Sequence, residues 1–252
     1  GALASRGAVQ FNPFVKIDAD GVVTVVLKHF EMGQGIATGL TTLVAEELDA
    51  DWDTAQIEFA PAHPDYNHTY YPLQGTGGSN AIANSWMQYR QAGAAAREML
   101  VAAAAQAWGV SPTGVTIDKG VIRSGGRSGG FGDFITAAAR MEPPVNPTIK
   151  NPSEFRLIGR ERLPRKDSVS KTDGSAIFAM DVRIPGMVYA LILRPPRPGA
   201  RLTGLDAGPA TEKHGYVGAE ALPTGEGVVV YARSTWAAIE ARSAIAAEWD
   251  FS

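Results

Sequence analysis

The sequence contains no cysteine. This absence excludes disulfide bonds, thiolate metal ligands, a cysteine nucleophile and any iron–sulfur cluster held by the chain's own thiolates. Long hydrophobic runs are also missing, since no stretch of about 18 residues is apolar enough to span a bilayer. Lysine and arginine form no dense cluster, and the net charge is −3. We therefore expect no transmembrane segment and no nucleic-acid partner.

The remaining composition is ordinary for a globular protein, with 252 residues of which 45% are hydrophobic and 19% charged. This length suits one large domain or two smaller ones. Residues 1–10 are mostly small and polar, without a charged and then apolar leader. Either no signal peptide existed or it has been removed, in which case Gly1–Ala4 are the remnant of its cleavage region.

The first part of the chain predicts a β–α–β unit. Residues 14–17 and 22–28 have the pattern of two strands, joined by a turn at Asp18-Ala19-Asp20-Gly21. Apolar residues from 36 to 48 then recur at helical spacing, and residues 56–60 form another strand pattern.

Two glycine-rich turns are the most informative feature. Glu31-Met32-Gly33-Gln34-Gly35 lies between a predicted strand and a predicted helix, and Gly75-Thr76-Gly77-Gly78-Ser79-Asn80 precedes a longer helix pattern. Glycine lets a backbone approach a ligand closely, and a helix N-terminus presents free N–H groups to an anion. Gln34 adds a neutral amide. We expect these residues to bind oxygen atoms of an anionic cofactor, with residues 33–35 and 76–80 as the contacts.

Other readings of these turns remain open. Both can be ordinary turns, with Gln34 solvated and residues 76–80 a plain helix cap. The second turn can also belong to an unrelated binder of nucleotide phosphates, although the chain lacks the Gly-Lys-Ser/Thr sequence of a P-loop.

Between and beyond these turns the chain alternates loops with short elements. Residues 61–73 form a long aperiodic loop, of the kind that is often functional. An alanine-rich helix is predicted over 80–108, capped by Ser79 or Asn80. A hairpin over 115–123 and a helix over 131–141 follow, and the proline-rich stretch 142–164 has the character of a crossing between domains.

The last part of the chain is predicted to be α+β and largely antiparallel. Strand patterns occupy 176–181, 187–193, 228–232 and 246–249. A helix is predicted over 234–244, with Ser234 as its N-cap.

Three further groups of side chains have unremarkable interpretations. The histidines share no metal-ligand spacing, and we expect all four at the surface or in loops: His29, His63, His68 and His214. The aromatic residues of the long loop and the following helix either line a substrate or subunit surface or, as we favour, pack on the body of the domain: Tyr66, Tyr70, Tyr71 and Trp86. Asp18 and Asp20 lack the remaining ligand positions of a calcium loop.

Several phrases of the sequence resemble one family. They are His29-Phe30-Glu31-Met32-Gly33-Gln34-Gly35, Leu43–Leu48, and Gln74–Ser79 together with Ile82–Ser85. They look like the large, molybdopterin-binding subunit of the molybdenum hydroxylases, the xanthine dehydrogenase and aldehyde oxidase superfamily. The isoquinoline 1-oxidoreductase β-subunit branch is the most similar. Three later stretches resemble the α/β-hammerhead domain of that family: Asp167–Gly174, Asp181–Ala190 and Gly227–Asp250.

The resemblance implies an α+β fold, with the N-terminal part of a molybdopterin-binding domain over 1–150 and an α/β-hammerhead domain over 151–252. The implied cofactor is molybdenum with molybdopterin cytosine dinucleotide, which takes no metal ligand from the protein. Gln34 would donate its amide to the apical oxo group of molybdenum. Gly33 and Gly35 would allow close approach, and residues 76–80 would contact the pterin or the pyrophosphate.

The implied activity is hydroxylation or dehydrogenation of an N-heterocyclic aromatic or an aldehyde, with water as the oxygen source. Electrons would leave to two-iron two-sulfur clusters on a partner iron–sulfur subunit, and a cytochrome or flavin subunit is a further candidate partner. Large subunits of the family continue well beyond the hammerhead domain and carry their general base there. No motif here matches that glutamate, and Glu31 is not assigned its role.

The alternative is a fragment that binds a cofactor or a partner without catalysis. We expect the chain alone to be inactive, to require the rest of a large subunit, and to self-associate through exposed apolar surface. By resemblance the location is periplasmic, with the cytoplasm as the alternative.

Overall fold

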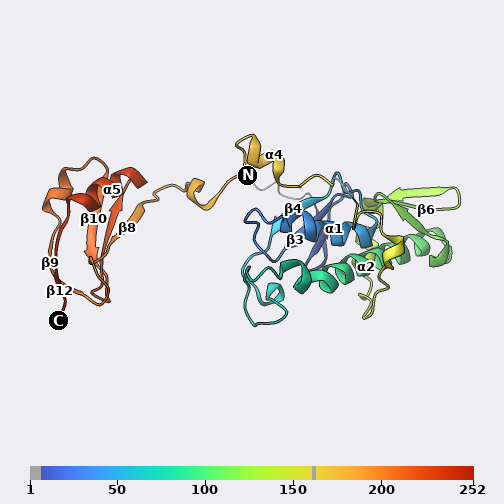
Figure 1. Cartoon of the computed structure of the whole chain (residues 1–252). Helices are drawn as coiled ribbons and strands as arrows, with labels where there is room; N and C mark the ends of the chain where they lie inside the picture. The colour runs from blue at the N-terminus through green and yellow to red at the C-terminus, as the bar shows by residue number, and fades with distance from the viewer. Residues whose placement is uncertain (1–6, 161–162) are drawn as a thin grey trace. The chain divides into compact units, whose positions relative to one another are not determined.

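The computed structural model describes residues 7–160 and 163–252. It divides into a first unit that ends at Ala176 and a second unit, Ile177–Ser252 (Figure 1). Helices and mostly antiparallel sheets occur in both, so the predicted α+β class is confirmed. The proposed cleavage remnant, Gly1–Ala4, lies outside the described residues. In the part of the chain that is described, no helix combines the length and hydrophobicity needed to cross a membrane.

The first unit is built on a four-stranded sheet with the order β1-β2-β3-β4. These strands are Val9–Asn12, Val15–Ile17, Val23–Leu27 and Gln56–Phe59. Strand β4 runs parallel to β3, and α1 (Ile36–Leu48) connects them, which confirms the β–α–β unit. The Asp18 carboxylate accepts the amides of Asp20 and Val22, which closes the predicted hairpin turn.

Helix α2 (Ala81–Trp108) lies along α1. A Cβ on Gly93 would lie 2.8 Å from the carbonyl oxygen of Val44, so the two backbones meet there at a distance only glycine permits. Nearer the start of both helices, Gly39 faces the side chain of Ile82. Because the contacts advance together along the two helices, their N-termini lie at the same end.

A small sheet completes the body of this unit, with β5 (Thr116–Asp118), β6 (Val121–Ser124) and β7 (Arg127–Gly130). The hairpin was predicted, but β7 was not, because Arg127-Ser128-Gly129-Gly130 has no alternation of apolar side chains. The helix predicted over 131–141 is wrong in extent: a 3-10 turn at Phe131–Asp133 leads into the short α3 (Ile135–Ala138).

The segment after residue 142 belongs to the first unit, so the structural division lies at 176/177 and not at the predicted 150/151. Buried glutamates on α1 explain why. Glu46 Oε2 accepts the backbone amides of Arg156, Leu157 and Ile158 at 2.8, 2.6 and 3.0 Å. Glu47 accepts the amide of Lys150 at 2.9 Å. These contacts span about a hundred residues of sequence, and spacing along the chain cannot reveal them.

The second unit has a three-stranded antiparallel sheet and a two-stranded one. The first contains β10 (Tyr216–Ala221), β11 (Val228–Ala232) and β8 (Tyr189–Leu193), and the second pairs β12 (Ala246–Asp250) with β9 (Arg201–Asp206). Helix α5 (Thr235–Ala244) packs on β8 and β11.

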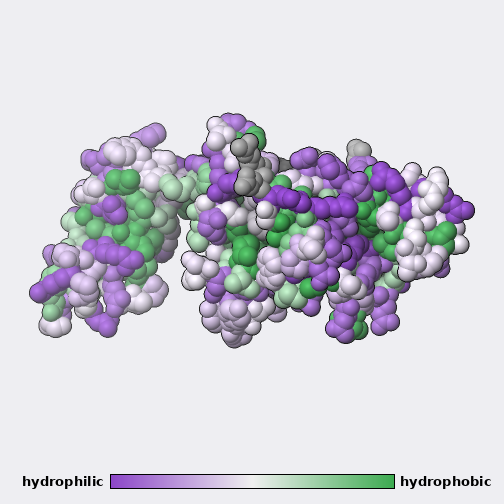
Figure 2. Space-filling model, turned by 45° about the vertical axis from the view of Figure 1, so that its right-hand side comes forward, coloured by the Kyte–Doolittle hydropathy of each residue, from purple (hydrophilic) through white to green (hydrophobic). Residues whose placement is uncertain are grey.

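Within this unit the predicted N-cap is confirmed, since Ser234 Oγ accepts the amide of Ala237. The strand predicted over 176–181 is wrong, because a 3-10 turn occupies Ala179–Asp181. Strands β9 and β10 were not predicted. Figure 2 shows hydrophobic residues gathered on one face of the second unit, and its exposed side chains include Val188, Leu205 and Val217. Self-association through such surface stays a prediction.

Candidate functional site

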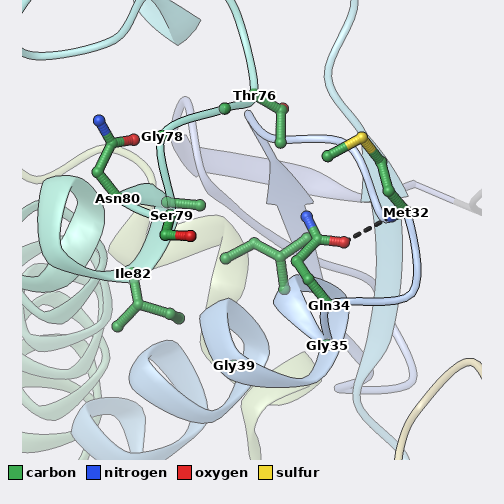
Figure 3. A pocket seen from close by; sticks show the side chains of 12 residues that line it. Met32, Gln34, Gly35, Gly39, Thr76, Gly78, Ser79, Asn80 and Ile82 are labelled. Carbon is green, nitrogen blue, oxygen red and sulfur yellow. Dashed lines mark hydrogen bonds between the residues drawn. The ribbon is translucent and has the colours of Figure 1, made fainter.

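The two glycine-rich turns meet at one cavity of about 510 Å³ (Figure 3). Its walls come from the Gln34 turn, the 76–80 turn and the first residues of α1 and α2. The lining residues are Met32, Gln34, Gly35, Ile36, Gly39 and residues 76–82. Of the predicted contacts, Gly33 alone is not among them. The structure thus brings together residues that lie more than forty positions apart.

The amide of Gln34 has a defined orientation. Its Oε1 accepts the backbone N–H of Met32 at 2.6 Å, and its Nε2 donates to the carbonyl oxygen of Phe30 at 2.7 Å. Both partners are backbone groups whose donor or acceptor role is fixed. If Oε1 and Nε2 of Gln34 were exchanged, Nε2 would face the N–H of Met32 and Oε1 would face the carbonyl oxygen of Phe30, and neither pair could form a hydrogen bond. Nε2 retains a second N–H, for which no described residue is an acceptor. Gln34 therefore offers the cavity a hydrogen-bond donor.

Glu31 shapes this turn from within. Its Oε1 accepts the amides of Gly33 and Gly35 at 2.8 and 3.0 Å, and its Oε2 accepts the amide of Ala37 at 3.0 Å. Burial by itself would raise the pKa of Glu31, but these three backbone hydrogen bonds outweigh it and hold the pKa below its usual value. A carboxylate engaged in this way is a structural acceptor and a poor general base, which agrees with leaving Glu31 out of that role.

The second turn is tied to the first by two hydrogen bonds. Thr76 Oγ1 accepts the amide of Phe30 at 2.9 Å, and His29 Nδ1 lies 2.9 Å from the carbonyl oxygen of Gly75. The chain then reverses through Gly78 and Ser79, whose φ angles are 65° and 54°. A left-handed conformation is uncommon for serine. It turns the backbone sharply into the start of α2.

Both helices begin at the cavity wall, and neither is capped by the side chain of its own N-cap residue, although Glu31 accepts the amide of Ala37 in the first turn of α1. Asn80 occupies the N-cap of α2, but its side chain makes no cap hydrogen bond, so the predicted side-chain cap is wrong. Its Oδ1 instead accepts from His68 Nε2 at 3.0 Å. The N-cap of α1 is Gly35, and neither helix has an acidic residue in its first turn. Both helix N-termini therefore lie at the same cavity, but Glu31 already accepts an amide of α1, so α2 presents the positive end that no carboxylate occupies.

The prediction that the histidines lie at the surface or in loops is confirmed, since all four lie outside helices and strands, but it did not anticipate that two of these loop histidines are buried. His29 and His68 are buried, and their ring centroids lie 5.8 Å apart. His29 Nδ1 donates to Gly75, so in the neutral ring Nε2 is an acceptor, and it has no partner among the described residues. Burial, the largest cause, lowers the pKa of His29.

The preceding residue, Lys28, is also buried. Burial lowers the pKa of its ammonium to about 8, and Nζ donates to Gln88 Oε1 at 2.6 Å. Sequence reasoning missed this polar layer beneath the turns. The one feature of the sequence that indicates this buried polar layer is the pair Lys28-His29, which directly follows the apolar strand β3.

The four aromatic residues of the long loop and the following helix differ in their burial. Tyr66 is buried and donates its hydroxyl to the carbonyl oxygen of Pro13 at 3.1 Å, and Trp86 packs against the core, as predicted. Tyr70 and Tyr71 are exposed, so the expectation that they pack on the body is wrong. Within the described ranges, no group of three or more His, Asp or Glu side chains is placed to hold a metal ion.

The chain belongs to the molybdopterin cofactor-binding domain family, whose model matches residues 5–176. Among curated proteins it is similar to the membrane-bound aldehyde dehydrogenase [pyrroloquinoline-quinone] of Gluconacetobacter polyoxogenes, with 33% identity over 98% of this chain and 33% of that protein. It is also 33% identical to the isoquinoline 1-oxidoreductase β-subunit of Brevundimonas diminuta, over 97% of this chain and 36% of that one. The chain thus spans about a third of the length of these relatives.

A further relative is a nicotinate dehydrogenase subunit of Pseudomonas putida, 31% identical over 74% of this chain and 15% of that protein. Among solved structures, quinoline 2-oxidoreductase from Pseudomonas putida 86 aligns with a TM-score of 0.38 and 20% identity, over 52% of this chain and 17% of that chain. A similarity at this TM-score carries no argument about the site.

Proposed function

We propose that the chain is the N-terminal part of a molybdenum-dependent hydroxylase or dehydrogenase. Its substrate class is an N-heterocyclic aromatic or an aldehyde, and water is its source of oxygen. Family membership supports a molybdenum cofactor, and the names of the relatives supply the two substrate classes. One observation carries the assignment of the site: the second Nε2 hydrogen of Gln34 and the N-terminus of α2, which has no side-chain cap, converge on one cavity.

The residues present fit an anionic pterin cofactor. A Cβ added at Gly33, Gly35 or Gly77 would meet nothing within 4 Å, so the backbone at these points is open to a ligand. Of the residues that the structure describes, those lining the cavity include no carboxylate that would repel phosphate. By resemblance the metal takes its sulfur ligands from the pterin, which makes the absence of cysteine compatible.

When bound, the cofactor would supply the two-electron oxidation and the transfer of a water-derived oxygen to the substrate. The chain's own residues would hold and orient it. Gln34 would donate its second Nε2 hydrogen to an oxygen ligand, where a carboxylate would repel and a neutral amide does not. Gly35 and Gly77 would admit the ring system, and the amides that begin α2 would face the pyrophosphate of a cytosine dinucleotide.

Proton transfer has to come from elsewhere. The cavity lining described here contains no Asp, Glu, His or Lys, and Glu31 is engaged by three backbone amides. We therefore propose that the base belongs to the rest of a large subunit and that electrons pass to an iron–sulfur partner subunit. The same observation favours a second candidate, in which the chain binds the cofactor or a partner without catalysis.

Cofactor analysis tests the proposal. The natural protein, purified with the proteins that accompany it, should contain molybdenum by mass spectrometry and release cytidine monophosphate after acid hydrolysis. Molybdenum with turnover supports the enzyme, and molybdenum bound by the 252-residue chain alone without turnover supports the binding module. One relative is named for pyrroloquinoline quinone, so that compound is assayed in parallel. Its presence without molybdenum or pterin would overturn the proposal.

A further inference from the structure

Arg165 reaches the Gln34 turn from a distant part of the chain. Its Nη1 donates to the carbonyl oxygen of Gly33 at 2.9 Å, and its Nη2 donates to Glu31 Oε1 at 3.1 Å. The same guanidinium holds Asp167 in a bidentate pair, with Nε–Oδ1 and Nη2–Oδ2 distances of 3.0 and 2.8 Å. All three nitrogens are therefore engaged, in the planar geometry that lysine cannot reproduce.

The hydrogen bond and the charge of Arg165 add to the three backbone hydrogen bonds that keep Glu31 an acceptor. The Glu31 side chain is only 4% exposed, and the Asp167 carboxylate beside it carries the same sign. Lys171 contacts Asp167, and its Nζ is 3.9 Å from Glu31 Oε1. Removing the guanidinium would leave two largely buried carboxylates with one lysine between them. The pKa of Glu31 would then rise, and a protonated Glu31 would hold the three backbone amides more weakly.

The orientation of Gln34 depends on that hold. Among the described residues its amide bonds only to Met32 in the turn and to Phe30 directly before it, so it follows the path of the turn. That path passes through Gly33 and Gly35, with φ angles of 102° and 89°. Glycine imposes no preference for these angles by itself. The Glu31 carboxylate and the Arg165 contact to Gly33 select them.

We propose that Arg165 is a positioning residue that acts through Glu31 to hold the free N–H of Gln34 toward the cavity. The segment around it is anchored independently of the turn, because the amide of Lys166 donates to Thr38 Oγ1 at 2.9 Å and Lys166 Nζ lies 4.5 Å from the centre of the Trp52 ring. The importance of Arg165 for cofactor binding rests on the proposed function, but its effect on Gln34 can be tested without a cofactor.

The test compares Arg165→Met with Arg165→Lys in the full chain, and Arg140→Met, at an exposed arginine, is the matched control. The side-chain amide of Gln34 is followed by NMR with 15N-labelled glutamine, its signal being assigned by its loss in Gln34→Ala. In the wild type and in Arg140→Met we expect a dispersed signal. In Arg165→Met its hydrogens should exchange with water about tenfold faster, which corresponds to the loss of one net hydrogen bond. Arg165→Lys should restore part of the difference.

A pH titration separates positioning from general destabilisation. Glu31 faces Arg165, Asp167 and Lys171, so the Gln34 signal should change at a higher pH in Arg165→Met than in the wild type. An unchanged signal and an unchanged midpoint in Arg165→Met would overturn the inference. If Arg165→Met fails to fold, the amide exchange rate and the titration midpoint are measured on Arg165→Lys instead. Lysine keeps the positive charge but cannot make the planar, multiple hydrogen bonds of the guanidinium. Molybdenum content is measured separately on the natural protein. If no molybdenum were found, the proposed function would be wrong, but the NMR signals of Gln34 would still test the role of Arg165.

Discussion

Replacing Gln34 gives the sharpest test of the site. In the complete enzyme, Gln34→Ala removes one donor aimed at the cavity, and loss of a single preorganised donor typically lowers turnover by about 10²–10³-fold. The two hydrogen bonds lost within the turn are at an exposed position, so the free energy of unfolding should fall by only about 1–2 kcal/mol. Turnover should therefore collapse while the fold persists.

Gln34→Glu should be worse than Gln34→Ala, and this order is specific to the geometry. A carboxylate oxygen in place of Nε2 would stand 2.7 Å from the carbonyl oxygen of Phe30 and would present negative charge to an anionic cofactor. We expect lower molybdenum content as well as lower turnover. The matched control is Gln91→Ala, at an exposed glutamine on α2.

The assay is turnover per molybdenum atom with an aldehyde and with an N-heterocyclic aromatic, together with thermal unfolding. Wild-type turnover and full molybdenum content in both Gln34 variants would refute the donor role.

The other predictions concern the scaffold. Glu46→Ala leaves three backbone amides without their acceptor, and it should lower the free energy of unfolding by about 3–5 kcal/mol in urea titrations. The control is Glu58→Ala, at a surface ion pair, which should change that free energy by less than about 1 kcal/mol. Burial would raise the pKa of Glu46, but its hydrogen bonds to the backbone and to Lys150 outweigh burial and lower that pKa. The stabilisation that Glu46 provides should therefore be complete above the unfolded-state pKa near 4.5 and be lost as pH falls below it. Equal losses of unfolding free energy in Glu46→Gln at neutral and at acidic pH would contradict this. Gly93→Val should lower the melting temperature through a destabilisation of about 1–3 kcal/mol, since its Cβ would lie 2.8 Å from the oxygen of Val44; a neutral effect would show that the helices do not meet there.

Much of the architecture could be predicted because it is encoded locally. The spacing of apolar residues in 36–48 is a helical stripe whatever surrounds it, and Asp18-Ala19-Asp20-Gly21 closes a turn with its own side chain and glycine. The two glycine-rich turns were recognised as candidate ligand contacts for the same reason. A hammerhead identity for the second unit stays a prediction.

The features that the sequence did not reveal share one cause. Histidines at positions 29 and 68 have no local feature that distinguishes a buried ring from a surface one, and Arg165 lies far along the chain from the turn that it contacts. The division at 176/177 likewise depends on carboxylates of α1 that accept amides from a segment a hundred residues later.

By itself, then, the sequence determined which residues can approach an anion and where the strongly periodic elements lie, such as the helix over 36–48, because conformational preference and periodicity act over a few residues. Only the tertiary structure decided that the two turns share one cavity, that the Gln34 amide presents a donor, and that Glu31 is occupied. Those properties are set by hydrogen bonds and charges between segments that the fold alone makes neighbours.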